Sequence, residues 1–269
     1  MFADLGEVRL FYTDEGRRAR PILFVHGYSC DSHDWMWQLP HFARSHRVIA
    51  VDLRGHGRSS APAEGYESKV FAADVATLLQ RLETGPVIAV GHSMGCNVVS
   101  ALAVEHPASV TAAVCVDPSY LISDEAHAGV QAVRDAMKAD PVATVQSLLG
   151  NSYAPASPPH LKSWHLRRVA GVPEHVLYQA MYGRGSLSHG SVSELYLRRR
   201  QCPVLTIYAK EDLVAAEAAL FSDPRSRAIA WASSGHWLHQ ERPAEFNAVV
   251  DAWLRDIGVV LDEPAQEDA

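Results

Sequence analysis

The sequence predicts an α/β protein with a mostly parallel, doubly wound sheet. Near-continuous apolar runs, helical patterns between them, and the regular alternation of the two are the observations behind this prediction. A strand that is apolar along its whole length is buried on both faces, as in a parallel sheet, whereas a strand of a half-exposed sheet alternates apolar and polar residues. Alternating strands and helices are typical of an α/β fold.

The predicted strands begin with a hairpin in residues 6–16 and continue as six apolar runs. These runs cover residues 21–27, 46–55, 86–93, 110–117, 202–209 and 226–233. Apolar residues at helical spacing predict helices over 68–82, 94–105 and 243–257, which lie between or after the strands.

The chain from residue 121 to 201 shows no buried strand. We expect a helical lid here, inserted after the sixth strand, because ligands of open α/β sheets bind at the carboxyl ends of the strands. The predicted organisation is therefore a core of residues 1–120 and 202–260, a lid of residues 121–201, and a frayed acidic tail of residues 261–269.

Proline placement predicts how the lid is divided. The pair Asp140-Pro141 separates residues 124–153 into two helices, because proline cannot continue a helix interior. A proline-rich turn is predicted at 154–164, followed by helices at 173–185 and 190–200.

Composition and charge exclude several classes of function. The net charge is −7, which disfavours nucleic acid and anionic membranes as partners because both need a basic face. None of the four cysteines forms a C-x-x-C pair, and neither a secretory signal nor a membrane-length apolar run is visible. We expect a cytoplasmic protein that acts on a small molecule without metal or cofactor. The sequence carries no signal for its oligomeric state.

The stretch Gly91-His92-Ser93-Met94-Gly95 lies where a predicted strand becomes a predicted helix. A serine in such a sharp turn presents its hydroxyl above the sheet, and flanking glycines allow backbone packing that a Cβ would block. The helix that begins at Met94 directs its positive end at the site where an oxyanion would form. Ser93 is thus the candidate nucleophile.

Three further motifs follow predicted strands in order. They are His26-Gly27-Tyr28, the glycine-rich turn at 52–59, and the segment 234–239 before the last helix. The backbone N–H groups of Tyr28 and Met94 are candidates to hold an oxyanion.

These four motifs, in this order, resemble those of the α/β-hydrolase superfamily, and the resemblance covers essentially the whole chain. It implies the α/β-hydrolase fold, Ser93 as nucleophile, His236 as general base, and a lid formed by residues 121–201. The sequence is similar to the small esterase-like and lactonase-like members. His239 is the rival to His236, but His236 directly follows Gly235 at a strand end and matches the family pattern.

Two aspartates satisfy the order serine, acid, histidine. Asp117 ends a fully apolar run, where a rigid strand would hold its carboxylate; certain lactonases and cofactor-free dioxygenases of this fold keep their acid there. Asp212 lies after the next strand, where most members keep it, although its connection to His236 is shorter than usual. We predict Asp117 as the acid and keep Asp212 as the alternative.

Aromatic and apolar residues near the strand ends and in the lid predict a mainly apolar pocket. The candidate substrate-binding residues are His26, Gly27, Tyr120, Tyr153, Trp164, Met181 and Trp237, with Tyr28, Trp35, Trp37, Leu121, Tyr178 and Tyr182 as further candidates.

The predicted function is hydrolysis of a carboxylic ester or lactone through an acyl-enzyme on Ser93. A cofactor-free dioxygenase, a carbon–carbon bond hydrolase and a non-catalytic small-molecule binder remain alternatives. An epoxide hydrolase or haloalkane dehalogenase would need a carboxylate at position 93.

Overall fold

A computed structural model describes residues 1–16, 20–182 and 187–259, so the predicted tail lies outside the described residues. Its centre is an eight-stranded sheet with the order β1-β2-β4-β3-β5-β6-β7-β8. The strands are β1 (Phe2–Asp4), β2 (Arg9–Glu15), β3 (Ile22–Val25), β4 (Val48–Val51), β5 (Val87–His92), β6 (Val110–Val116), β7 (Val204–Tyr208) and β8 (Arg227–Ala230). From β4 to β8 all neighbours are parallel, and β1 and β2 form an antiparallel edge. The predicted mostly parallel sheet is confirmed.

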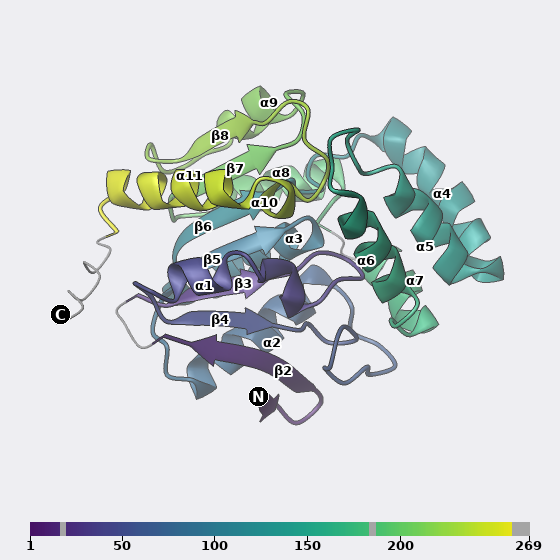
Figure 1. Ribbon diagram of the computed structural model, residues 1–269, viewed down its shortest axis with the longest axis horizontal. Helices are drawn as coiled ribbons and strands as arrows, with labels where there is room; N and C mark the ends of the chain where they lie inside the picture. The colour runs from purple at the N-terminus through teal and green to yellow at the C-terminus, as the bar shows by residue number, and fades with distance from the viewer. Residues whose placement is uncertain (17–19, 183–186, 260–269) are drawn as a thin grey trace.

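Helices cover both faces of the sheet (Figure 1). One face carries α1 (Leu39–Phe42), α10 (Leu238–Glu241) and α11 (Pro243–Asp256), and the other carries α2 (Ser68–Arg81) and α3 (Met94–Glu105). Shorter elements are η1 (Ser32–Trp35), η2 (Pro107–Ser109) and α9 (Val214–Ala218). Two separate clusters of buried apolar side chains result, one on each side of the sheet, which is the doubly wound arrangement.

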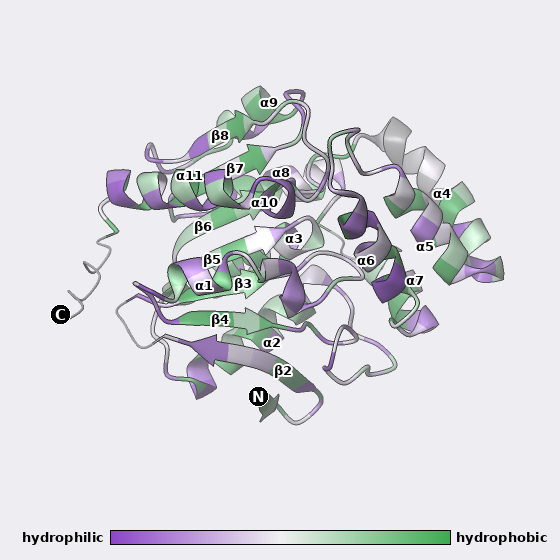
Figure 2. Cartoon of the chain, viewed as in Figure 1, coloured by the Kyte–Doolittle hydropathy of each residue, from purple (hydrophilic) through white to green (hydrophobic). Residues whose placement is uncertain are grey.

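All described residues between β6 and β7 that form regular structure are helical, apart from one isolated bridge. The helices are α4 (Asp124–Ala139), α5 (Pro141–Gly150), α6 (Pro159–Val169), α7 (Glu174–Tyr182) and α8 (Gly190–Arg199). Figure 1 places α4 to α7 beyond the carboxyl ends of the parallel strands. In Figure 2 these helices mix hydrophilic and hydrophobic colours, whereas the central strands are mostly hydrophobic.

The predicted division of these helices is correct at one place and wrong at another. The break at Asp140-Pro141 is present, and the Asp140 carboxylate caps α5 by accepting the N–H of Ala143 at 2.9 Å. The turn predicted at 154–164 ends earlier, because α6 already begins at Pro159. Proline is tolerated in the first turn of a helix, where its missing N–H would have no intrahelical partner.

The predicted N-terminal hairpin is shifted along the chain. Residues 9–15 form one continuous strand, β2, and its partner is β1, with Phe2 opposite Phe11. The turn therefore covers residues 5–8, at the start of the predicted range 6–16 rather than in its middle. None of the helices in the described part of the chain combines the length and apolar character needed to cross a membrane.

Candidate active site

Ser93 occupies a sharp turn between β5 and α3. Its backbone angles are φ 51° and ψ −116°, a conformation that non-glycine residues rarely adopt and that needs support from its surroundings. The flanking glycines supply that support through close backbone packing. A Cβ on Gly91 would lie 2.5 Å from the carbonyl oxygen of Gly95, and one on Gly95 would lie 2.3 Å from that of Val25.

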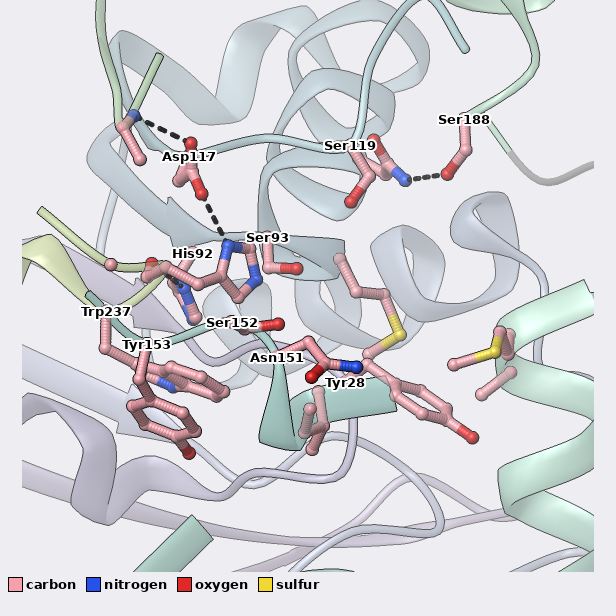
Figure 3. A pocket seen from close by; sticks show the side chains of 18 of the residues that line it. Tyr28, His92, Ser93, Asp117, Ser119, Asn151, Ser152, Tyr153, Ser188 and Trp237 are labelled. Carbon is pink, nitrogen blue, oxygen red and sulfur yellow. Dashed lines mark hydrogen bonds and ion pairs between the residues drawn. The ribbon is translucent and has the colours of Figure 1, made fainter. Parts of the chain in front are cut away.

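Asp117 follows the last residue of β6 and faces His236. Its Oδ2 lies 2.5 Å from Nδ1 of His236, and its Oδ1 accepts the backbone N–H of Ala209 at 2.9 Å (Figure 3). The backbone N–H of Asp117 donates to the carbonyl oxygen of Ile207 at 2.8 Å. The carboxylate is thus held by the end of β7 while it bonds the imidazole.

Asp212, the alternative acid, is exposed and does not line the cavity that contains Ser93. The structure therefore brings His236 to Asp117 and not to Asp212. With Nδ1–H of His236 donated to Asp117, the lone pair of Nε2 is free to accept a proton.

The His236 backbone is bound on both sides. Its N–H donates to the carbonyl oxygen of Ser152, which follows α5, at 2.8 Å. Its carbonyl oxygen lies 2.9 Å from Nε2 of His92, the residue before Ser93. Because a carbonyl can only accept, Nε2 of His92 carries the proton. Burial and the nearby His236 imidazole hold the pKa of His92 well below its usual range, so this ring is neutral.

His239, the rival base, is fully buried and is not part of the cavity lining. Its ring lies against Trp35, with ring centroids 4.4 Å apart, on the side of the sheet where α11 packs. Burial lowers its pKa to about 3. His239 therefore lies outside the cavity that Ser93 and His236 both line.

A cavity of about 510 Å³ contains the side chains of Ser93, Asp117 and His236. Tyr28 and Met94, the two candidate oxyanion donors, also line it. Further lining residues are Tyr66, Glu67, Ser68, Phe71, His92, Asn97, Ser119, Leu149, Asn151, Ser152, Tyr153, Ala154, Ala180, Met181, Ser188, Ala209, Lys210, Ser234, Gly235 and Trp237. Residues of the helical segment between β6 and β7 thus form part of the wall, several of them visible in Figure 3.

Of the predicted substrate-binding residues, Tyr153, Met181 and Trp237 line this cavity. The structure corrects the prediction for His26 and Gly27. The buried His26 ring accepts the backbone N–H of Leu53 at 3.0 Å and thereby holds two strand ends together.

Gly27 is needed for packing rather than for substrate contact. A Cβ at this position would lie 2.8 Å from Nδ1 of His92. The close approach leaves no room for a side chain without displacing that imidazole.

Tyr120 and Trp164 also lie outside the cavity. The hydroxyl of Tyr120 is buried, 2.6 Å from Oγ of Ser100, and it donates to the carbonyl oxygen of Cys96 at 2.8 Å. Trp164 is 37% exposed, and its ring lies 5.1 Å from that of His160 on the same helix, measured between centroids. Among the further candidates, Trp35 is a core residue and Trp37 is exposed. The side chain of Tyr182 is outside the described residues.

The prediction from sequence missed the polar part of the cavity wall. Ser119, Asn151, Ser152 and Ser188 contribute hydroxyl and amide groups to it. These residue types are common in loops, so no local pattern distinguishes them from solvated loop residues.

Known proteins and a family model are similar to this chain over much of its length. The family model for the alpha/beta hydrolase fold matches residues 20–243. A dihydrolipoyllysine-residue acetyltransferase component of an acetoin cleaving system from Cupriavidus necator is 29% identical over 94% of this chain and 68% of its own length. A non-heme chloroperoxidase from Streptomyces lividans is 40% identical, over only 40% of each chain.

Among solved structures, Est816, described as an N-acyl homoserine lactone degrading enzyme, superposes with a TM-score of 0.82 at 26% identity. The superposition covers 94% of this chain and 99% of that one. Together with the family model, which matches most of the sequence, this likeness shows that the chain belongs to the α/β-hydrolase fold family.

Proposed function

We propose that this protein is a serine hydrolase that cleaves a carboxylic ester or lactone of a mainly apolar or aromatic small molecule. The general class, a hydrolase with the α/β-hydrolase fold, follows from the family. The finer proposal rests on one observation: the 2.5 Å contact between Nδ1 of His236 and Oδ2 of Asp117 beside the strained Ser93 turn, in one cavity.

In the proposed reaction the Ser93 hydroxyl attacks the substrate carbonyl carbon while Nε2 of His236 accepts its proton. Asp117 stabilises the imidazolium that forms. The backbone N–H groups of Tyr28 and Met94 bind the oxyanion of the tetrahedral intermediate.

His236 then donates its proton to the departing alkoxide oxygen, which leaves an acyl-enzyme on Ser93. A water molecule then attacks the acyl carbonyl while the same imidazole accepts its proton. His236 returns this proton to Oγ of Ser93 as the bond between Ser93 and the acyl group breaks and the acid leaves. For a lactone, the alcohol and the acid leave as one molecule.

The cavity supports a substrate of modest size. Its volume of about 510 Å³ falls in the range of small-molecule sites. Phe71, Leu149 and Met181 offer apolar contacts. The likeness to Est816 supports testing lactones with an acyl-amide substituent alongside aryl and alkyl esters.

The decisive experiment measures turnover of aryl esters, alkyl esters and lactones by the wild type and by Ser93→Ala. We expect turnover in the wild type and its loss in the variant, with mass spectrometry detecting a covalent adduct of a phosphonate inhibitor on Ser93. Turnover of an ester that persists in Ser93→Ala would contradict the proposal.

A cofactor-free dioxygenase is the second candidate, favoured by the same Asp117–His236 pair, because a histidine base oriented by an aspartate after the sixth strand could deprotonate an aromatic substrate without using Ser93. Oxygen consumption with aromatic ketone substrates, retained in Ser93→Ala, would identify this reaction instead. Absence of both activities, with a ligand that stabilises the protein, would identify a binding protein.

A further inference from the structure

Three buried side chains gather near His236, where the His92 ring lies 4.7 Å from the His236 ring and 4.8 Å from the His239 ring, measured between centroids. Asp34 comes from η1, His92 ends β5, and His239 lies in α10. Each offers one nitrogen or carboxylate oxygen, and these three atoms lie within 4.8 Å of one another. The exposed fractions of the three residues are between 0% and 1%, and Asp34 and His239 do not line the substrate cavity.

One ring nitrogen of His92 has an unused lone pair. Its Nε2–H donates to the carbonyl oxygen of His236, so Nδ1 is unprotonated in the neutral ring. Nδ1 is buried and has no hydrogen-bond partner among the described residues. Histidines that bind a metal usually donate their other ring N–H to a carbonyl or carboxylate, which is the arrangement found here.

Asp34 has one oxygen engaged and one free. Its Oδ1 accepts from the guanidinium of Arg168, while Oδ2 is buried with no hydrogen-bond partner in the described part of the chain. Burial by itself would raise the pKa of Asp34, but the charges of Arg168 and His165 outweigh burial and hold it far below its usual range. The carboxylate is therefore ionised, and its orientation is fixed by Arg168.

His239 has both ring nitrogens buried and unpaired within the described residues. Burial lowers its pKa to about 3, so the ring is neutral and one nitrogen always carries a lone pair. The ring lies against Trp35, with 4.4 Å between centroids, which restricts its orientation.

We propose that Asp34, His92 and His239 form a binding site for a divalent transition-metal ion, with zinc as the best match. Two imidazole nitrogens and one carboxylate oxygen are a ligand set that Zn²⁺ accepts, with a water molecule in the fourth position. This proposal departs from the expectation of a metal-free protein, which rested on sequence spacing alone.

The electrostatics and geometry of the cluster are compatible with a divalent ion. Because Nε2 of His92 donates to the His236 carbonyl oxygen, Nδ1 carries a lone pair and needs no deprotonation before an ion binds. Asp31 and Asp34 both pair with Arg168, so these three residues together carry one net negative charge beside the proposed ion position. Bonds of about 2.1 Å in tetrahedral geometry place ligand atoms roughly 3.4 Å apart. The three atoms here lie within 4.8 Å of one another, so the side chains must move closer together to bind an ion.

The ion would affect the proposed active site indirectly, through the hydrogen bond between His92 and the His236 carbonyl. It would not contact the substrate, because two of its three ligands lie outside the cavity. Coordination at Nδ1 of His92 polarises its Nε2–H and strengthens the hydrogen bond to the His236 carbonyl. The expected effect is stabilisation of the fold and of the segment that carries His236.

Calorimetric titration of the full-length, chelator-treated protein with ZnCl₂ tests the site directly. We expect one Zn²⁺ per chain and a rise in Tm on binding. His239→Gln and Asp34→Asn should each weaken the affinity at least tenfold, and His175→Gln, which removes an exposed imidazole on α7, should leave it unchanged. Unchanged affinity in both ligand variants, or no binding to the wild type, would overturn the proposal.

A measurement on the wild type covers the case in which the ligand variants do not fold. Crystals grown with ZnCl₂ should show an anomalous scattering peak among Asp34, His92 and His239. A water molecule could satisfy the same three groups, and density for water without an anomalous peak would overturn the proposal. Ser93→Ala should bind Zn²⁺ like the wild type, so this test is independent of the proposed hydrolysis.

Discussion

Asp117 and His236 are separated by 119 residues in the chain, and their side chains meet with 2.5 Å between Oδ2 and Nδ1. Asp117 reaches this position with a positive φ of 42° immediately after β6, and the N–H of Ala209 holds its second oxygen. The strained backbone and the two hydrogen bonds fix the carboxylate, so the imidazole orientation depends on Asp117.

Asp117→Asn is expected to lower kcat by about 10⁴, because an amide favours the wrong imidazole tautomer while preserving the shape of the site. Asp212→Asn is the matched control and should retain kcat within about twofold, since Asp212 is exposed and outside the cavity. Steady-state kinetics on the best ester or lactone provides the measurement. Loss of activity in the control rather than in Asp117→Asn would show that Asp212 is the acid.

Gly95→Ala should destabilise the fold, because its Cβ would lie 2.3 Å from the carbonyl oxygen of Val25. We expect a loss of about 1–3 kcal/mol in the free energy of unfolding, typical of overpacking. Gly129→Ala is the control: it lies in α4 with nothing within 4 Å of the added Cβ, and should stabilise by about 0.5–1 kcal/mol. Urea unfolding measures both, and equal effects would contradict this account of the turn.

Arg168→Leu is expected to cost about 3–5 kcal/mol in the free energy of unfolding, because it leaves the buried Asp34 carboxylate without its charged partner. The guanidinium belongs to α6 and Asp34 to η1, so the pair fastens the helical segment to the core. The double variant Asp34→Asn/Arg168→Leu should be less destabilised than the sum of the single changes. Additive effects in a double-mutant cycle would mean that the pair contributes nothing.

Stability is expected to fall as the pH drops below about 6.5, the usual histidine value. Burial lowers the pKa of His56 and His239 to about 3 and of His165 to about 4, and it also lowers that of His92. Between the unfolded and folded values the unfolded chain binds more protons, so each histidine removes about 1.4 kcal/mol per pH unit. Once the pH is below a histidine's pKa in the folded state, both states are protonated, and that histidine causes no further loss of stability.

Tm measured from pH 8 to pH 4 checks this dependence. Replacing a buried histidine, as in His56→Gln, should flatten the decline between roughly pH 6.5 and 4 relative to the wild type, whatever the change in absolute Tm. A Tm that stays constant over this range would contradict the burial of neutral histidines.

Much of the architecture follows from local sequence. The helices over 68–81, 94–105 and 243–256 lie within one residue of their predicted bounds, because apolar periodicity and helix termini are local signals. The Ser93 turn was recognisable for the same reason, since its glycines, strand and helix are contiguous. The N-terminal hairpin was misplaced because the pairing of an edge strand depends on a partner as well as on its own residues.

The tertiary structure alone decided which groups meet. Asp117 and Asp212 both follow apolar strands, and only the packing of β6 beside β7 brings one of them to His236. Asp34, His92 and His239 share no sequence motif that would group them, because η1, β5 and α10 are distant in sequence. Local propensities determine the elements of this chain, whereas contacts between distant side chains, which burial and packing create, determine its chemistry.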